Sequence, residues 1–376
     1  MLNQFIPLFK VFMPESVKEP LLETLFSGYI GQGIKVEEFE KRLSGYIGNP
    51  HAVTVNSGTS GLQLALRLAN VGPEDEVITT PMTCTATNMA IMATGARIVW
   101  ADIDPVSGNI DPLDIQKKIS SKTKAIMVVH WGGYPCELNE IQDIAGTHGI
   151  KVIEDAAHGM GAEYKGKRIG NHSDYVVFSF QAIKHMTTID GGVLFCRKDA
   201  DYKRGKRLRW YGIDRKVKDS NARHECEQNI PEWGYKFHMN DVCAAIGLEQ
   251  IKYLDQNVQT CRKNAKFYTK ELEGFEGVNP LPGLQDRKGS FLFYTLHITR
   301  GHEAFANYMY KKNIMVSQVH ARNDENSCFK AFAGGPLKGV DAFTRTMMCI
   351  PSGWWVDAKA RQTIVTGIKA YFSRIR

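Results

Sequence analysis

The sequence lacks several features that mark particular classes of protein. It has no apolar run of 18 residues, which argues against a membrane-spanning helix. The opening seven residues have neither the basic region nor the long apolar core of a secretory signal peptide. The eight cysteines form no C-x-x-C pair and no Cys/His spacing suited to zinc. We therefore expect reduced thiols, no metal site, no membrane partner and a cytoplasmic location.

A strong charge imbalance is also missing. The chain has 47 Lys and Arg against 40 Asp and Glu, a net charge of +7. The basic residues are dense only at 203–209, which could attract a phosphorylated ligand or nucleic acid. A solvated helix face is the commoner explanation of such a cluster. We predict no nucleic-acid partner, and a cofactor-binding regulator remains a remote alternative.

What the sequence does have is apolar content for a large core. Of its 376 residues, 43% are hydrophobic, enough for more than one domain. Short β-branched and apolar runs predict seven strands, at 51–55, 76–80, 97–103, 125–130, 152–155, 175–180 and 193–196. Helical patterns are predicted at 16–27, 36–46, 62–69, 89–94, 113–119, 138–147, 202–211 and 241–254. Strands that alternate with helices indicate an α/β fold with a mostly parallel sheet covered on both faces.

The pattern changes at about residue 255. We predict a large α/β domain over 1–254, including an N-terminal helical segment and a polar loop with Asp219-Ser220-Asn221. A smaller C-terminal α+β domain is predicted over 255–376. Its elements are helices at 260–272, 303–312 and 358–374 and a strand at 291–299.

Polar side chains follow two of the predicted strands directly. Asp155 and His158 come after one strand, and Ser179 and Lys184 come after the next. In parallel sheets, ligands collect beyond the carboxyl ends of the strands. A lysine amine can form a Schiff base with an aldehyde, a carboxylate can keep a ring nitrogen protonated, and a serine can donate to phosphate. The residues together suit an aldehyde cofactor with a ring nitrogen and a phosphate.

Each of these residues also has an ordinary structural explanation. Asp155 could cap a helix, His158 could be a hydrogen-bonded core histidine, and most lysines are solvated. The turn at 56–61 opens a helix, so Gly58 and Thr59 could seat a phosphate or belong to a simple N-cap, with equal weight. It is the combination on consecutive strand ends that favours a site.

At these positions the chain resembles a known family. The motifs are Asn56-Ser57-Gly58-Thr59-Ser60, Glu154-Asp155-Ala156-Ala157-His158, Ser179-Phe180-x-x-x-Lys184, Thr188-x-x-Gly191-Gly192, Gly234-Tyr235-x-x-x-Met239 and Ile350-Pro351-x-x-x-Trp355. They are similar to the signature of the DegT/DnrJ/EryC/StrS family of nucleotide-sugar aminotransferases that depend on pyridoxal phosphate. This family has the aspartate aminotransferase fold. The resemblance covers nearly the whole chain.

The resemblance implies a role for each matching residue. Lys184 forms the Schiff base and moves protons, and Asp155 pairs with the ring nitrogen beside His158. Gly58, Thr59 and Ser179 hold the phosphate. Family members are homodimers with shared active sites, so Lys236, where the family often has Asn, is expected to reach the partner's cofactor. Cys84 falls where many members stack an aromatic residue on the ring, and His185 and His320 are candidate substrate contacts.

The expected reaction transfers an amino group from glutamate to a keto group of a nucleotide-linked deoxysugar, for cell-surface polysaccharide or glycoside biosynthesis. One branch of the family has His in place of the reactive Lys and dehydrates sugars. Counting from Ser179 places Lys184, not His185, at the reactive position, which favours transamination. A sugar dehydratase is the nearest alternative.

Overall fold

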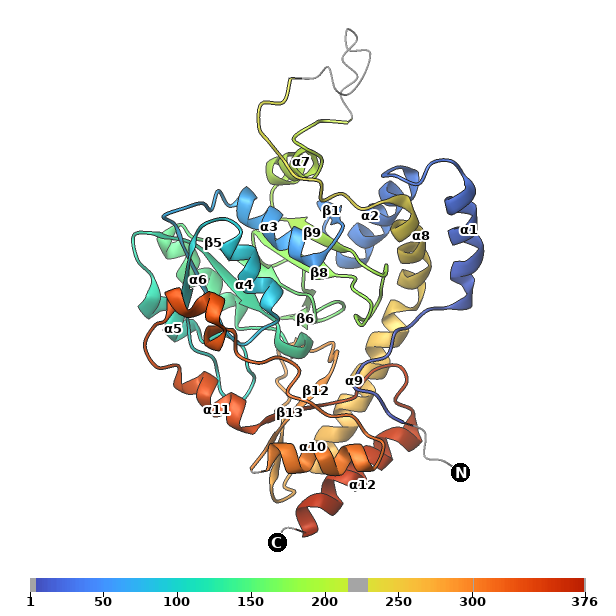
Figure 1. Ribbon diagram of the computed structural model, residues 1–376, viewed down its shortest axis with the longest axis vertical. Helices are drawn as coiled ribbons and strands as arrows, with labels where there is room; N and C mark the ends of the chain where they lie inside the picture. The colour runs from blue at the N-terminus through green and yellow to red at the C-terminus, as the bar shows by residue number, and fades with distance from the viewer. Residues whose placement is uncertain (1–4, 216–228, 300, 375–376) are drawn as a thin grey trace.

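The chain builds one large sheet and two small ones (Figure 1). The computed structural model describes residues 5–215, 229–299 and 301–374. The large sheet has seven strands in the order β1-β9-β8-β5-β4-β2-β3. They are β1 (Ala52–Val55), β2 (Glu76–Thr79), β3 (Arg97–Trp100), β4 (Thr123–Val129), β5 (Lys151–Asp155), β8 (Tyr175–Ser179) and β9 (Gly192–Cys196). Only β9 runs against the others, so the prediction of a mostly parallel seven-stranded sheet is confirmed.

Helices cover both faces of this sheet. They are α1 (Lys18–Phe26), α2 (Ile34–Ile47), α3 (Gly58–Leu68), α4 (Thr85–Met92), α5 (Pro112–Lys118), α6 (Leu138–His148), α7 (Asp199–Leu208) and α8 (Asp241–Gln250). One core lies where α3, α4 and α7 pack on the sheet, and a second lies where α2, α5, α6 and α8 pack. Because both faces are buried, the strands read as continuous apolar runs.

The C-terminal part surrounds a third core. Its sheet has the order β10-β12-β13, from β10 (Val278–Pro280), β12 (Tyr294–Ile298) and β13 (Met347–Ile350). The helices are α9 (Leu254–Leu272), α10 (His302–Lys311), α11 (Lys338–Thr346) and α12 (Ala358–Arg374). The third sheet joins β11 (Arg287–Lys288) to β6 (Glu163–Tyr164) and β7 (Lys167–Arg168). Short 3₁₀ helices are η1 (Glu15–Val17), η2 (Trp131–Gly133), η4 (Ile251–Tyr253), η5 (Asn323–Glu325) and η6 (Ser327–Phe332).

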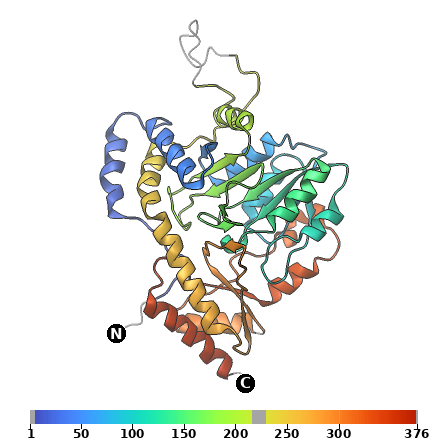
Figure 2. The same ribbon diagram turned by 180° about the vertical axis from the view of Figure 1, so that it is seen from behind.

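Helix α9 connects the two parts and runs alongside both in Figure 2. Its first turns contribute Leu254 and Val258 to the second core, and its last turns contribute Tyr268 and Leu272 to the third. At the other end of the chain, Ile6 pairs with Ile314 of the C-terminal part. The division at residues 254 and 255 therefore falls at the start of a shared helix, and it stays a prediction.

The predicted helices are present, with starts displaced by a few residues. The prediction omitted α11 and the strands β6, β7, β10, β11 and β13. These strands are two to four residues long, too short to show a period, whereas α11 has an amphipathic pattern that the prediction missed. The polar loop expected around Asp219-Ser220-Asn221 lies outside the described residues. Within the ranges that the structure describes, no helix combines the length and apolar character needed to cross a bilayer.

Candidate active site

The predicted site residues meet at one edge of the large sheet. Asp155 ends β5, Ser179 ends the adjacent parallel strand β8, and Gly58 begins α3 just after β1. Strand β1 runs parallel to β8, with β9 between them. Their carboxyl ends consequently share one rim, where ligands of α/β sheets bind.

Asp155 is held on both carboxylate oxygens. It is only 5% exposed. Thr87 Oγ1 donates to its Oδ2 at 2.7 Å, and the Ala157 amide donates to its Oδ1 at 3.0 Å. An ionised carboxylate offers about four lone-pair sites, so each oxygen can still accept a further donor.

Lys184 lies on the loop between β8 and β9. Hydrogen bonds from Phe180 to the Gly191 carbonyl and from Thr188 to the Phe180 carbonyl close this loop. A Cβ on Gly191 would lie 2.2 Å from Thr188 Oγ1, and one on Gly192 would lie 2.8 Å from the Phe178 carbonyl. Only glycine fits at these two positions, which confirms that the pair allows a tight loop.

Burial lowers the pKa of Lys184 to about 8, against the opposing effects of the Asp155 carboxylate and the Cys84 thiol. Removal from water disfavours the charged amine. A lysine with this pKa has a substantial neutral fraction near physiological pH, as nucleophilic attack on an aldehyde requires. The same interactions place Asp155 and Cys84 in the electrostatic neighbourhood of the amine.

The start of α3 forms a seat for an anion. Ser57 caps the helix by accepting from the Ser60 amide at 3.0 Å. The amides of Gly58 and Thr59 have no acceptor within the described ranges. Ser179 Oγ accepts from the Gln181 amide at 3.3 Å, so its hydrogen can donate elsewhere. The cap and the free amides coexist, so the two explanations of this turn are compatible.

His158 and His320 lie together beside the rim. Their rings stack with centroids 5.7 Å apart and planes 5° from parallel. His158 Nδ1 and His320 Nε2 are buried without a hydrogen-bond partner in the ranges described. Burial and then the charge of Lys184 lower the pKa of His320 to about 4, and the same causes hold the pKa of His158 well below its usual value. Both rings are therefore neutral and offer unused nitrogens.

Two other predicted residues are arranged differently. His185 Nε2 bonds the Ser290 carbonyl at 3.0 Å, and the His185 carbonyl accepts from Asn257 at 3.2 Å. Its ring is thus engaged with the segment before β12, and its role as a substrate contact stays a prediction. Lys236 is exposed, and its carbonyl accepts from Asn56 Nδ2 at 3.3 Å, beside the phosphate seat.

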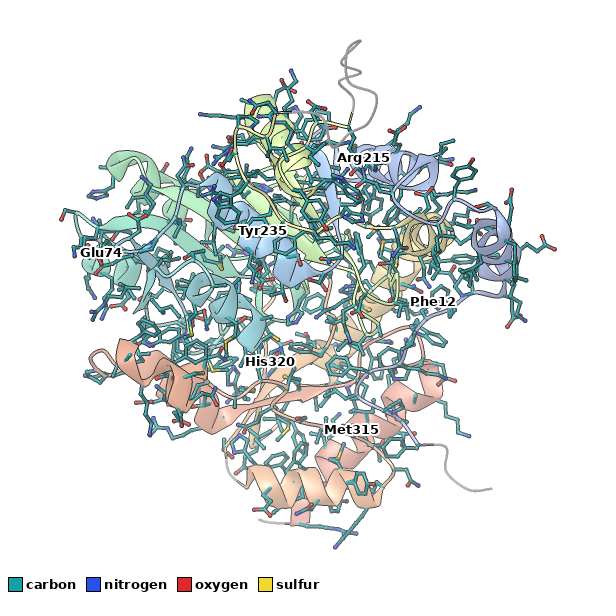
Figure 3. All side chains as sticks on the ribbon, turned by 45° about the horizontal axis from the view of Figure 1, so that its top comes forward. Phe12, Glu74, Arg215, Tyr235, Met315 and His320 are labelled. Atoms are coloured by element: carbon teal, nitrogen blue, oxygen red, sulfur yellow. The ribbon has the colours of Figure 1, made fainter. Side chains whose placement is uncertain are left out.

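The sequence did not predict several residues that hold the site residues in place through hydrogen bonds. Thr87 bonds Asp155, and Ser290 Oγ donates to the His158 carbonyl at 2.8 Å. Asn323 anchors the segment that carries His320 (labelled in Figure 3), because its Nδ2 donates to the Thr83 carbonyl at 2.8 Å. Thr83 and Thr87 stand four residues apart, one just before α4 and one in its first turn, a spacing that could have indicated neighbouring hydroxyls.

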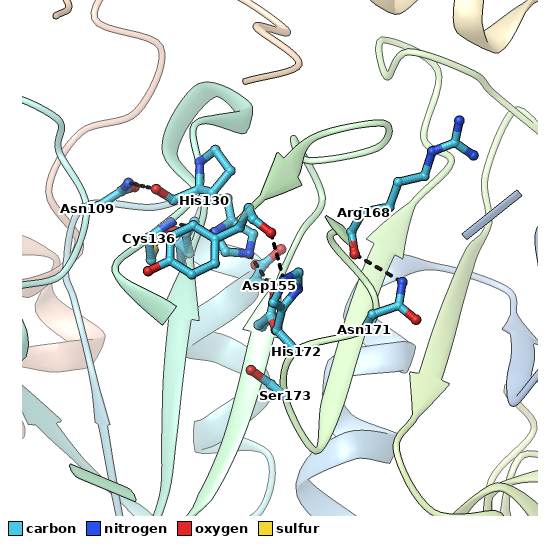
Figure 4. Close-up of polar contacts among 12 residues, drawn as sticks. Asn109, His130, Cys136, Asp155, Arg168, Asn171, His172 and Ser173 are labelled. Atoms are coloured by element: carbon cyan, nitrogen blue, oxygen red, sulfur yellow. Dashed lines mark hydrogen bonds and ion pairs between the residues drawn. The ribbon is translucent and has the colours of Figure 1, made fainter. Parts of the chain in front are cut away.

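A second buried polar group lies behind the rim. His130 Nε2 is 2.8 Å from Glu154 Oε2, and both side chains are fully buried. The Cys136 amide lies 3.1 Å from His130 Nδ1 (Figure 4). Because a backbone amide can only donate, Nδ1 carries no proton and Nε2 donates to Glu154. This pair fixes the residue before Asp155 on β5.

The basic cluster on α7 is largely neutralised within the chain. Lys203 pairs with Asp199, Arg204 with Glu232, and Lys206 and Arg209 with Glu40. Paired cations contribute little to an electrostatic footprint for nucleic acid. This removes most of the support for a nucleic-acid-binding regulator.

Comparison with known proteins agrees with this geometry. The model of the DegT/DnrJ/EryC1/StrS aminotransferase family matches residues 13–369. The UDP-4-amino-4-deoxy-L-arabinose--oxoglutarate aminotransferase of Shewanella sediminis is 36% identical over 283 residues, 75% of this chain and 72% of that protein.

Solved structures share the whole fold. AtS13 from Actinomadura melliaura has a TM-score of 0.93 and 41% identity, covering 98% of this chain and 100% of that one. A Streptococcus pneumoniae protein solved in its PLP-form has a TM-score of 0.91 and 25% identity, covering 99% and 100%.

The cofactor suits the residues present. Free amides at Gly58 and Thr59 suit the phosphate, the carboxylate of Asp155 suits a protonated ring nitrogen, and the amine of Lys184 suits the aldehyde. The cofactor is pyridoxal phosphate, and the chain belongs to the DegT/DnrJ/EryC1/StrS aminotransferase family.

Proposed function

We propose that this aminotransferase moves an amino group from glutamate to a keto group of a nucleotide-linked deoxysugar, for polysaccharide or glycoside biosynthesis. The observation that carries the proposal is the convergence of Lys184 and Asp155 at one rim, with the Lys184 pKa lowered to about 8. The relative from Shewanella sediminis, named for a UDP-amino sugar and oxoglutarate, supports this choice of donor and acceptor.

Pyridoxal phosphate, when bound, supplies an electron sink for the negative charge that develops on the substrate carbon. The chain's own residues hold it and move the proton. Asp155, held by the Ala157 amide, would hold the ring nitrogen, and Gly58, Thr59 and Ser179 would donate to the phosphate. With its amine free, Lys184 would use Nζ to take a proton from one carbon and return it to another. A pKa of about 8 suits both directions of that transfer near neutral pH.

His158 and His320 supply polar groups on the proposed substrate side of the site. His320 Nε2 and His158 Nδ1 are unpaired in the ranges described, and both rings are neutral. We assign His320 to a sugar hydroxyl or keto oxygen and His158 to the ring and its phenolic oxygen. A neutral imidazole can donate or accept, which suits a polar sugar.

A homodimer with shared sites is part of the proposal. Apolar side chains are unusually exposed from α1 to the start of α2: Leu22 53%, Phe26 85%, Tyr29 85% and Ile34 79%. Contiguous exposed apolar residues are typical of an interface, and a second copy of the chain is the proposed occupant. Lys236 reaches the partner's phosphate as a point charge. The free cysteines in the described ranges suit a reducing compartment, and we propose the cytoplasm.

The assignment is tested with Lys184→Ala. This variant is expected to lose turnover with glutamate and a nucleotide ketosugar, and also the cofactor link that borohydride reduction traps. Full transaminase activity in the variant contradicts the assignment. Measuring 2-oxoglutarate formed per sugar consumed separates transfer from dehydration, because a dehydratase forms none.

The shared site is tested by mixing subunits. Lys184→Ala and Lys236→Ala are each expected to be impaired as homodimers. If Lys236 acts across the interface, the mixed dimer contains one intact site and recovers activity. If Lys236 acts within its own chain, each site of the mixed dimer has a defect and no activity returns.

A further inference from the structure

Behind the Asp155 carboxylate lies a chain of buried hydroxyl groups. Thr83 Oγ1 is 2.8 Å from Thr87 Oγ1, which is 2.7 Å from Asp155 Oδ2. Thr87 is fully buried, and Thr83 is 2% exposed. Hydroxyl groups this deep normally find partners, but nothing in the fold requires that the partner be a carboxylate.

The direction of the hydrogen bonds follows from chemistry. An ionised carboxylate only accepts, so the Thr87 hydroxyl must donate to Asp155. Its oxygen is then free to accept, so the Thr83 hydroxyl donates to Thr87. Donors aligned in this way polarise one another, which strengthens the bond that ends on the carboxylate.

The backbone beside these hydroxyl groups is bonded to the C-terminal part. Asn323 Nδ2 donates to the Thr83 carbonyl at 2.8 Å, and the Asn323 amide donates to the Pro81 carbonyl at 2.9 Å. Asn323 lies three residues beyond His320. The backbone of Thr83 is therefore held from the same segment that brings His320 to the site.

We propose that Thr87, supported by Thr83, is a positioning residue that sets the orientation of the Asp155 carboxylate toward the ring nitrogen. With the Ala157 amide on Oδ1 and Thr87 on Oδ2, the carboxylate plane is fixed on both sides. Both donors withdraw electron density, so the proton of the Asp155–ring pair stays on the ring nitrogen, where the electron sink needs it. This inference rests on the proposed role of Asp155.

The test uses the full-length holoenzyme and three readouts: turnover, the dissociation constant for pyridoxal phosphate, and the pH dependence of the bound cofactor's absorbance. A hydrogen bond to a charged group contributes about 1.5–3 kcal/mol, so Thr87→Val should slow turnover by about 10- to 100-fold. The midpoint of the absorbance titration should also shift. Thr87→Ser, which keeps the hydroxyl, should restore both to within about threefold of wild type, about 0.6 kcal/mol.

Further variants separate positioning from structure. Thr83→Val should shift the same readouts in the same direction by a smaller amount. If Thr87→Val does not fold, Thr83→Val takes its place as the test. Thr363→Val, on the exposed face of α12, controls for loss of a helix hydroxyl and should change nothing. In an Asp155→Asn background, Thr87→Val should reduce turnover by less than about twofold more, because Thr87 acts on the ring only through the Asp155 carboxylate.

Two failures can be told apart. If Asp155→Asn leaves the absorbance profile unchanged, the role of Asp155 itself is wrong. If Asp155→Asn changes the profile but Thr87→Val does not, or Thr87→Ser is as damaging as Thr87→Val, the positioning role of Thr87 is overturned.

Discussion

His158 and His320 stack face to face, 5.7 Å apart and 5° from parallel, although 162 positions separate them in the sequence. One follows β5 of the large sheet, and the other belongs to the segment before η5 in the C-terminal part. Phe293 and Trp131 pack edge-on against them, which fixes the stack from two sides. The stacked pair therefore packs the loop after β5 of the large sheet against the segment before η5 in the C-terminal part.

The turn that holds the phosphate leaves little room for a side chain at Gly58. A Cβ there would lie 3.0 Å from Ser179 Cβ and 3.3 Å from its Oγ. Gly58→Ala should therefore displace Ser179 and weaken binding of pyridoxal phosphate by about 10-fold, or about 1.4 kcal/mol. Binding of pyridoxal, which lacks the phosphate, should change little. Gly72→Ala meets no atom within 4 Å and is the control. Equal losses for both ligands would place the defect elsewhere.

The lowered pKa of Lys184 makes a prediction about stability. Its folded-state pKa is about 8, against 10.5 for the free side chain, so burying the ammonium destabilises the apoprotein below pH 8. The penalty is at most about 3 kcal/mol and disappears as the pH rises from about 8 to 10.5. Apo Lys184→Met should be more stable than wild type at pH 7, with a gain that shrinks over this interval. Thermal unfolding of both proteins across the pH range checks this prediction. A stability difference that does not change with pH would show that the buried Lys184 charge is not its cause.

Asn323 is fully buried between the two parts of the chain. Its side chain accepts from Asn88 at 3.1 Å and donates to the Thr83 carbonyl. Asn323→Ala removes the donor to the Thr83 carbonyl and leaves Asn88 Nδ2 with the Thr80 carbonyl as its acceptor, and it should cost about 2 kcal/mol of unfolding free energy. It should also raise KM for the sugar more than it lowers kcat, because the segment holding His320 loosens. Asn326→Ala, at an exposed position of the same segment, should do neither. Denaturant titration and steady-state kinetics measure the two effects.

The His130–Glu154 pair is a buried element of the rim. Both side chains are fully buried, and His130→Ala leaves the Glu154 carboxylate without its donor. Removing one partner of a buried pair typically costs about 3–5 kcal/mol, so a loss of this size is expected in urea unfolding. The exposed His148→Ala should stay within about 0.5 kcal/mol of wild type. A similar small change for His130→Ala would show that the pair contributes little to stability.

The sequence by itself determined the large sheet and the chemistry on its rim. Strands buried on both faces are continuous apolar runs, and their sharp ends placed Asp155 and Ser179 together before any coordinates. Lys184 followed from its spacing to Ser179, and the glycine pair after it predicted the tight loop. Each of these features depends on residues that are close together in sequence, so one short segment is enough to predict it.

Only the tertiary structure decided what supports those residues. Thr87 and Ser290 bond Asp155 and the His158 carbonyl from segments far away in the sequence, and Asn323, close to His320, bonds the distant Thr83 carbonyl. No local pattern predicts these three contacts. Tertiary packing also directs the His185 ring to the Ser290 carbonyl and pairs the basic cluster on α7 with acidic residues distant in sequence. The physical reason is that hydrogen bonds and ion pairs depend on distances of about 3 Å, which are set only when distant segments pack together. Strand burial, in contrast, is indicated by the apolar pattern of neighbouring residues.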